Sequence, residues 1–160
     1  MFKEEIVVEK LKKLNWHISF AESCTGGMVS ATLVNVADAS KVFDESFVTY
    51  ANKAKTELIG VDESVIMKFG VVSEEVAAQM AEGAAKTARA EVGVGISGIA
   101  GPSGATATKP VGLVCFGFCV DGSISTFSEY FGDIGRNNVR KRATEFVFEK
   151  LSDLLEDVEV

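Results

Sequence analysis

Two short glycine-bearing segments most constrain how this chain of 160 residues can fold. Residues 21–27 and 95–102 each follow an apolar run that is typical of a buried strand, and each combines small residues, hydroxyls and glycines. A chain that leaves a strand through such a turn can bring backbone N–H groups and a hydroxyl close to a ligand. The two turns therefore predict a pocket at the ends of the strands, where open α/β sheets usually bind ligands.

The pattern along the chain alternates between helix and strand periodicity. Predicted helices cover residues 3–15, 25–36, 52–59, 62–69, 73–89 and 136–156, and predicted strands cover 17–22, 43–51, 92–97, 111–120 and 124–131. Asp121-Gly122-Ser123 is a hairpin signal, so the strands on either side of it are expected to pair antiparallel. The other strands are joined through helices, which favours parallel pairing. The sequence predicts one α/β domain over residues 1–160, with helices on both faces of a mixed sheet.

Composition and charge argue against several classes of protein. No stretch approaches the roughly 18–20 apolar residues of a membrane span, and the N-terminus lacks the apolar core of a signal peptide. We therefore expect a cytoplasmic protein without a membrane partner. The net charge of −7 argues against a general nucleic-acid binder, but it is compatible with a local cationic pocket for a small anion. Cys115 and Cys119 are expected to be small core residues, because the three cysteines have no disulfide-framework spacing.

The single histidine, His17, limits the kinds of catalytic centre. A Ser–His–Asp triad would have to run through His17, and a multi-histidine metal site is impossible. His17 lies at a helix-to-strand junction beside Trp16, a position more typical of a structural residue. A hydrolase with this sequence would therefore need a carboxylate, a lysine or a tyrosine as its base.

Ser23 is the best candidate for a nucleophile. It lies where a strand passes into a helix, so the N-terminal N–H groups of that helix could stabilise an oxyanion. Its surroundings do not match the Gly-x-Ser-x-Gly pattern, and a helix cap is the alternative role. Cys24 is a rival nucleophile, and Glu22 could bind a hydroxyl, act as a base or cap a backbone group.

Tyr50, Lys53 and Lys55 follow the next apolar run. A lysine in a dry pocket can lose its proton near neutral pH and activate a serine, and a tyrosine can relay or donate a proton. Without further context, Lys53 and Lys55 are more typical of solvated surface lysines.

Several groups in the second half of the chain could bind an anion. Ser97 and the glycines of residues 98–104 could hold a phosphate through backbone N–H groups, although neither a Walker motif nor Gly-x-Gly-x-x-Gly is present. Lys109 precedes Pro110 and could contact an anion. Arg136 and Arg140 lie four residues apart on one face of the last predicted helix, which suits a phosphate or a carboxylate. The alternative for the two arginines is a solvated helix face.

Together these segments resemble the C-terminal domain of the CinA family, the PncC-type nicotinamide mononucleotide deamidases. The matching segments follow the family's order over nearly the whole chain and are residues 21–27, 47–55, 58–61, 70–73, 97–102, 109–112 and 139–140. The chain resembles the stand-alone form, without the further N-terminal domain of larger members. The resemblance implies a three-layer α/β/α sandwich that self-associates as a homodimer or a larger homo-oligomer.

The resemblance also implies a reaction, namely hydrolysis of the carboxamide of nicotinamide mononucleotide to nicotinic acid mononucleotide and ammonia in the pyridine nucleotide cycle of NAD metabolism. Ser23 would be the nucleophile, with Tyr50 and Lys55 as activating partners, and neither a cofactor nor a metal would be required. Backbone N–H groups of residues 24–27 would hold the oxyanion. The residues expected to contact the substrate are Glu22, Cys24, Thr25, Gly26, Gly27, Ser97, Gly98, Gly101, Lys109, Arg136 and Arg140.

Three departures from the family pattern lie on the expected phosphate and ribose side. Ala105 stands where the family usually has a second glycine, Leu113 replaces a common threonine, and residues 131–136 fit the family's Gly-Asp-Arg run only with a shift. A side chain at Ala105 would be strained if the loop required a positive φ there. The alternative function is therefore a nucleotide-binding or regulatory domain with the same pocket and no turnover. A third reading is an enzyme for another small amide or ester.

Overall fold

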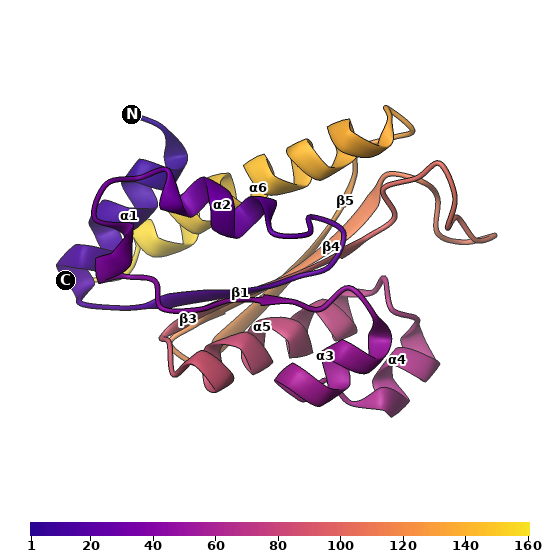
Figure 1. Cartoon of the computed structure of the whole chain (residues 1–160), viewed down its shortest axis with the longest axis horizontal. Helices are drawn as coiled ribbons and strands as arrows, with labels where there is room; N and C mark the ends of the chain where they lie inside the picture. The colour runs from indigo at the N-terminus through magenta and orange to yellow at the C-terminus, as the bar shows by residue number, and fades with distance from the viewer.

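The computed structural model describes all 160 residues as a five-stranded mixed sheet between two layers of helices (Figure 1). In the order β2-β1-β3-β4-β5, β1 is parallel to β2 and β3, whereas the two remaining pairs are antiparallel. The strands are β1 Ile18–Glu22, β2 Phe47–Val48, β3 Val92–Gly98, β4 Leu113–Val120 and β5 Ser123–Tyr130.

Helices cover both faces of this sheet. One face carries α1 Lys3–Leu14, α2 Met28–Val34 and α6 Arg136–Glu156, and the other carries α3 Asn52–Ile59, α4 Glu63–Phe69 and α5 Glu74–Ala88. This arrangement confirms the predicted α/β/α sandwich with a mixed sheet. None of the helices combines the length and the apolar character needed to cross a bilayer.

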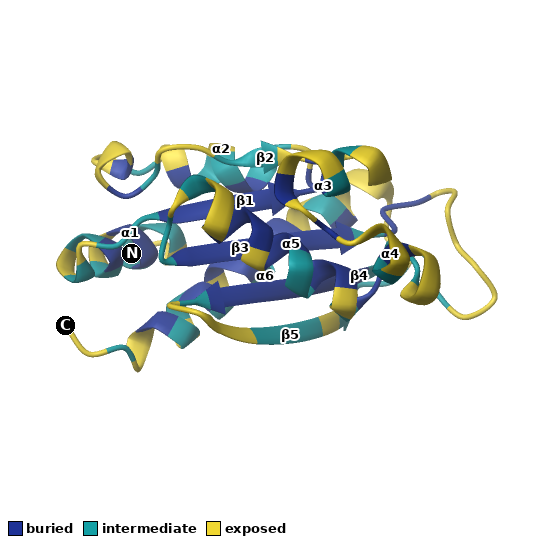
Figure 2. Cartoon of the chain, turned by 90° about the horizontal axis from the view of Figure 1, so that it is seen from below, coloured by how far each residue is buried: buried dark blue, intermediate teal, exposed yellow.

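The two faces of the sheet are packed in different ways. Under α1, α2 and α6 lies the largest apolar cluster, whose 22 buried residues include the large rings of Phe20, Phe116 and Phe118. On the opposite face the backbone of α5 lies against the sheet itself, because a Cβ added at Gly95 or Gly117 would meet the carbonyl oxygen of Ala77. Figure 2 shows the buried strands in dark blue and the largely exposed loop beyond β3 in yellow.

Side-chain caps fix two helix starts where the sequence predicts them. The Ser73 hydroxyl accepts a hydrogen bond from the Val76 N–H at 3.2 Å, and the Asp62 carboxylate accepts one from the Ser64 N–H at 2.9 Å. Each side chain satisfies one of the N–H groups that the first turn of a helix leaves without a partner.

Two predicted elements are shorter in the structure. The helix predicted over residues 25–36 is α2, which begins only at Met28, because Gly26 and Gly27 have φ values of 56° and 108° in the left-handed region. The strand predicted over residues 43–51 is reduced to the two residues of β2 and one isolated bridge at Phe43. β2 lies at the sheet edge, where only one neighbour offers hydrogen bonds, and the chain then turns toward α3.

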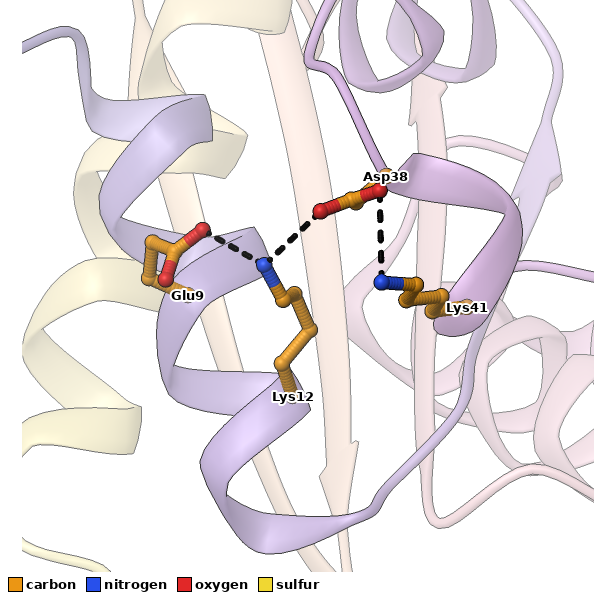
Figure 3. A network of polar contacts seen from close by, with 4 residues as sticks. All are labelled: Glu9, Lys12, Asp38 and Lys41. Atoms are coloured by element: carbon orange, nitrogen blue, oxygen red, sulfur yellow. Dashed lines mark hydrogen bonds and ion pairs between the residues drawn. The ribbon is translucent and has the colours of Figure 1, made fainter.

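A network of charged side chains connects α1 with the 3-10 turn η1 Ala39–Lys41 (Figure 3). Lys12 Nζ lies 3.0 Å from Glu9 Oε1 and 3.2 Å from Asp38 Oδ2, and Lys41 Nζ lies 3.4 Å from Asp38 Oδ1. The hydrogen bond from Lys12, followed by that from Lys41, lowers the pKa of Asp38. Since the network is exposed to solvent, salt is expected to weaken it.

The close contact between α5 and the sheet gives a first prediction. The substitution Gly117→Ala places a methyl group against the Ala77 carbonyl, so α5 must move outward. We expect the free energy of unfolding to fall by about 1–3 kcal/mol, as for other overpacked cores, measured by urea denaturation. The exposed control Ser123→Ala is expected to stay within about 0.5 kcal/mol of the parent. Equal stability of Gly117→Ala and the parent would show that α5 is not held at this separation.

Candidate active site

The candidate site lies at the carboxyl ends of β1, β2 and β3, which meet at one edge because the three strands are parallel. The chain leaves β1 toward α2 on one face and leaves β2 toward α3 on the other. Such a divergence opens a crevice between neighbouring strand ends, the usual ligand site of an open α/β sheet. Ser23 directly follows β1, while Tyr50 and Lys55 follow β2.

The structure brings Lys55 and Ser23 together. Lys55 Nζ lies 3.1 Å from Ser23 Oγ, 2.7 Å from the Thr49 carbonyl oxygen and 3.2 Å from the Tyr50 carbonyl oxygen. The side chain is 0% exposed, and no carboxylate forms an ion pair with it. An ammonium can donate to all three oxygens. A neutral amine can still donate to the two carbonyls, which leaves its lone pair for the Ser23 hydroxyl proton.

Burial sets the protonation of this lysine. Removal from water lowers the pKa of Lys55 to about 8, while the nearby Cys24 thiol acts in the opposite direction. With a pKa of about 8, roughly a tenth of the amine is neutral at pH 7, far more than for a solvated lysine. Burial also raises the pKa of Cys24 to about 11, so its thiol stays protonated and is a weak rival to Ser23 as a nucleophile.

A cavity of about 300 Å³ adjoins the Ser23–Lys55 pair. Among the other predicted site residues, those that line it are Cys24, Tyr50, Ser97, Gly98, Gly101 and Arg136. Lining residues without an expected role are Asn52, Val71, Val72, Ile99, Ala100 and Ser103, whereas Gly104 is one of the glycines expected to hold a phosphate. Asn52 lies inside the segment 47–55 that carries the family resemblance, and residues 99–104 belong to a loop already singled out. Val71 and Val72 lie in another segment of the family resemblance, residues 70–73, and the fold brings them to the cavity.

Tyr50 and Arg136 form the exposed rim of this cavity. The Tyr50 side chain is 61% exposed, and its hydroxyl accepts a hydrogen bond from Arg136 at 3.0 Å. Arg136 also donates to the Gly101 carbonyl oxygen at 2.8 Å and has no carboxylate partner. The contact of Tyr50 with Lys55 runs through the Tyr50 carbonyl, not through the phenol. The rim therefore offers an uncompensated guanidinium, which suits an anionic ligand.

Glu22 does not line the cavity but caps α2. Its fully buried carboxylate accepts hydrogen bonds from the N–H groups of Gly27, Val29 and Ser30 at 3.1, 2.9 and 3.0 Å, and from the Ser30 hydroxyl at 2.7 Å. The N-terminal N–H groups of α2 are therefore occupied by the chain's own side chain.

Within the Ser23 turn, only some N–H groups can still bind an oxyanion. The Gly26 N–H donates to the Ser23 carbonyl at 3.1 Å, and the Gly27 N–H donates to Glu22. The N–H groups of Cys24 and Thr25 donate to no acceptor within the chain. Of the N–H groups of residues 24–27 that were expected to bind the oxyanion, only those of Cys24 and Thr25 are therefore available.

The other predicted contact residues that lie outside the cavity lining are Thr25, Gly26, Gly27, Lys109 and Arg140. Lys109 donates to the carbonyl oxygens of Phe69 and Val72 and so attaches the loop after β3 to the connection between α4 and α5. It lines a separate cavity of about 630 Å³ that contains neither Ser23 nor Lys55. Arg140 donates to backbone carbonyls of the Ser23 turn.

Two other expectations concern His17 and Ala105. His17 precedes β1, at the opposite end from Ser23, and its Nδ1 lies 2.9 Å from Asp44. This placement agrees with the structural role expected for a junction residue. Ala105 does not adopt a positive φ, whereas Gly104 does, with φ 100°. The loop after β3 therefore follows its path without the strain that a side chain at position 105 would cause in the left-handed region.

The fold and the site together define a three-layer α/β protein with a buried lysine hydrogen-bonded to a serine at the carboxyl ends of parallel strands. The family model described as CinA C-terminal domain matches residues 2–155, and the chain belongs to this family. A CinA-like protein of Kosmotoga olearia is 49% identical over 146 residues, which cover 91% of this chain and 35% of that protein. The chain thus spans about a third of the length of the curated relatives it matches first.

Solved structures share the whole fold. The competence/damage inducible protein CihA from Agrobacterium tumefaciens has a TM-score of 0.91 and 38% identity, over 98% of this chain and 99% of that chain. A CinA superfamily protein from Klebsiella pneumoniae has a TM-score of 0.93 and 30% identity, over 98% of this chain and 97% of that chain. These likenesses cover every element that positions the Ser23–Lys55 pair.

The buried position of Lys55 gives a second prediction. Since burial disfavours the ammonium form, the Nζ of Lys55 should titrate near pH 8, below the ordinary lysine pKa of 10.5. The side-chain carbon signals of labelled lysine, followed by NMR from pH 6 to 11, measure this directly. The variant Lys55→Met assigns the signal by removing it. A midpoint near 10.5 for that signal would contradict a desolvated amine at the site.

Proposed function

We propose that this protein hydrolyses the carboxamide of nicotinamide mononucleotide to nicotinic acid mononucleotide and ammonia. The observation that carries the proposal is the 3.1 Å contact between the buried Lys55 amine and the Ser23 hydroxyl beside a cavity. An amide resists attack by a neutral hydroxyl, so the serine needs a base within hydrogen-bond reach. Family membership supports the class of protein, and the resemblance of the site segments supports the substrate.

In the first half of the proposed reaction, the neutral Lys55 amine takes the Ser23 proton while Ser23 Oγ bonds to the carboxamide carbon. The carbonyl oxygen becomes an oxyanion, for which the N–H groups of Cys24 and Thr25 are the donors left in the turn. The Lys55 ammonium then returns its proton to the amide nitrogen. The carbon–nitrogen bond breaks, ammonia leaves, and an ester to Ser23 remains.

In the second half, water replaces ammonia. The Lys55 amine accepts a proton from water as the water oxygen bonds to the ester carbon, and the Ser23 oxygen leaves with the proton from Lys55. The products are the restored serine and the carboxylic acid, which loses its proton to the ammonia or to water to give the carboxylate. Every proton in this scheme moves through one nitrogen, so no cofactor or metal takes part in it.

The phosphate of the substrate would occupy the side of the cavity formed by the loop after β3 and by Arg136. The N–H groups of Ala100, Gly101, Ser103 and Gly104 donate to no acceptor within the chain, and these residues line the cavity. Successive backbone N–H groups and one guanidinium are a common setting for a phosphate. In this assignment the Arg136 guanidinium gives up one of its hydrogen bonds to Gly101 and Tyr50 and donates to the phosphate instead.

Removing either member of the central pair should abolish most turnover. We expect Ser23→Ala to release no ammonia above background, and Lys55→Ala to lower kcat by about 10²-fold or more, because the base is lost. Ammonia release from nicotinamide mononucleotide is the measurement. Lys53→Ala, on the same helix with an exposed side chain, is the matched control and should retain full activity. Full activity in Ser23→Ala would show that Ser23 is not the nucleophile. A loss under about threefold in Lys55→Ala would show that Lys55 is not the base.

Loss of the rim guanidinium should weaken substrate binding more than chemistry. Charge-assisted hydrogen bonds contribute about 1.5–3 kcal/mol, so Arg136→Ala should raise KM about 10- to 100-fold with a smaller change in kcat. Initial rates over a range of nicotinamide mononucleotide concentrations separate the two constants. Lys141→Ala, an exposed change on the same helix, serves as the control. An unchanged KM in Arg136→Ala would place the phosphate elsewhere.

The alternative of a binding or regulatory domain shares the same cavity. Binding of nicotinamide mononucleotide by calorimetry without ammonia release would favour it, whereas robust turnover would exclude it. A panel of other small amides and esters tests the third reading. Three expectations stay predictions: a single domain over residues 1–160, self-association as a homodimer or larger homo-oligomer, and a cytoplasmic location. Light scattering measures the self-association.

A further inference from the structure

We propose that Arg140 is a positioning residue of this site, which holds the backbone of the Ser23 turn so that the N–H groups of Cys24 and Thr25 face the reaction. This inference rests on the proposed amide hydrolysis and assigns Arg140 a role other than contact with the substrate. Two of the three partners of the guanidinium are carbonyl oxygens of that turn.

Each of the three nitrogens of the Arg140 guanidinium has a partner within the protein. Its Nε lies 2.9 Å from the Cys24 carbonyl oxygen, and one terminal nitrogen lies 3.2 Å from the Thr25 carbonyl oxygen. The other terminal nitrogen lies 3.1 Å from Asn137 Oδ1, one turn earlier on α6. No carboxylate forms an ion pair with Arg140, and Arg140 does not line the cavity. The positive charge of Arg140 therefore acts mainly on the Cys24 and Thr25 peptide groups, which follow Ser23 in the chain.

Peptide planarity transmits this contact to the other side of the turn. In a trans peptide the carbonyl and the following N–H point in opposite directions. Because the Cys24 carbonyl is turned toward Arg140, the Thr25 N–H is turned away from it. The Ser23 carbonyl accepts from Gly26, which likewise orients the Cys24 N–H away from that hydrogen bond. Neither of these two N–H groups has an acceptor within the chain.

The positive charge also strengthens the donor that it orients. A cation at a carbonyl oxygen polarises the amide and makes its N–H a better donor, as in other hydrogen-bonded chains. The opposite end of the turn is fixed by Glu22, which takes the N–H groups at the start of α2. A negative side chain on the N–H side and a positive one on the carbonyl side thus leave little freedom for the intervening peptides.

The test separates orientation from binding. Removal of one oxyanion donor typically costs about 10²–10³ in kcat, so Arg140→Ala should lower kcat by about 10²-fold and change KM by less than about threefold. Millimolar guanidinium added to Arg140→Ala should restore part of kcat by filling the vacated place. Arg140→Lys keeps the charge but loses the planar two-point contact, so we expect an intermediate kcat. Lys141→Ala is the neighbouring exposed control and should match the parent.

A second readout does not depend on the substrate. A fluorophosphonate probe bonds to Ser23 Oγ as fluoride leaves, and its phosphoryl oxygen needs the same donors, so Arg140→Ala should slow labelling by a similar factor. If the parent protein is labelled at Ser23 yet hydrolyses no nicotinamide mononucleotide, the proposed function fails while Arg140 is still tested.

Three results would overturn the positioning role. The first is a KM about tenfold higher with unchanged kcat, which would make Arg140 a substrate contact. The second is unchanged kcat and unchanged labelling. The third is a loss of kcat that guanidinium does not restore and that follows a lowered melting temperature in both Arg140→Ala and Arg140→Lys, which would leave only a structural role.

Discussion

The site depends on one buried amine that has carbonyls, not a carboxylate, as its partners. An acidic partner would stabilise the ammonium of Lys55 and raise its pKa. The carbonyls of Thr49 and Tyr50 instead bind two of its protons and leave the third position opposite Ser23. These carbonyls are available because β2 ends at Val48 and the chain turns toward α3. The brevity of the edge strand is therefore a condition for the chemistry proposed at Ser23.

The same preference for backbone partners recurs on the other side of the crevice. Glu22 and Arg140 carry opposite charges, yet each is satisfied by peptide groups of the segment that contains Ser23. Because a buried or half-buried charge needs several well-placed hydrogen bonds, each side chain fixes the backbone that supplies them. The serine is thereby held by two elements, β1 and α6, that are far apart in the chain.

The sequence was informative where signals are local. Capping side chains and periodicity gave the bounds of α5 and α6 closely, and the turn residues between β4 and β5 gave the hairpin. The bounds of α2 and β2 were wrong because glycine conformation and edge position override local propensity. The pairing of Ser23 with Lys55 was expected from the family resemblance. The backbone partners of Arg140 could not be expected, since only tertiary packing creates them.

The difference between the two faces of the sheet has a consequence for how this protein tolerates change. Beneath α1 and α6, large rings such as Phe20 and Phe148 can exchange volume with one another, since a smaller residue at one position leaves space for a larger one nearby. Beneath α5, backbone touches backbone at Gly95 and Gly117, and no side chain is available to compensate. Redesign or evolutionary drift of the core is therefore most restricted at these two glycines, where backbone contact sets the distance between α5 and the sheet, whereas elsewhere α5 packs through side chains such as Val76 and Met80.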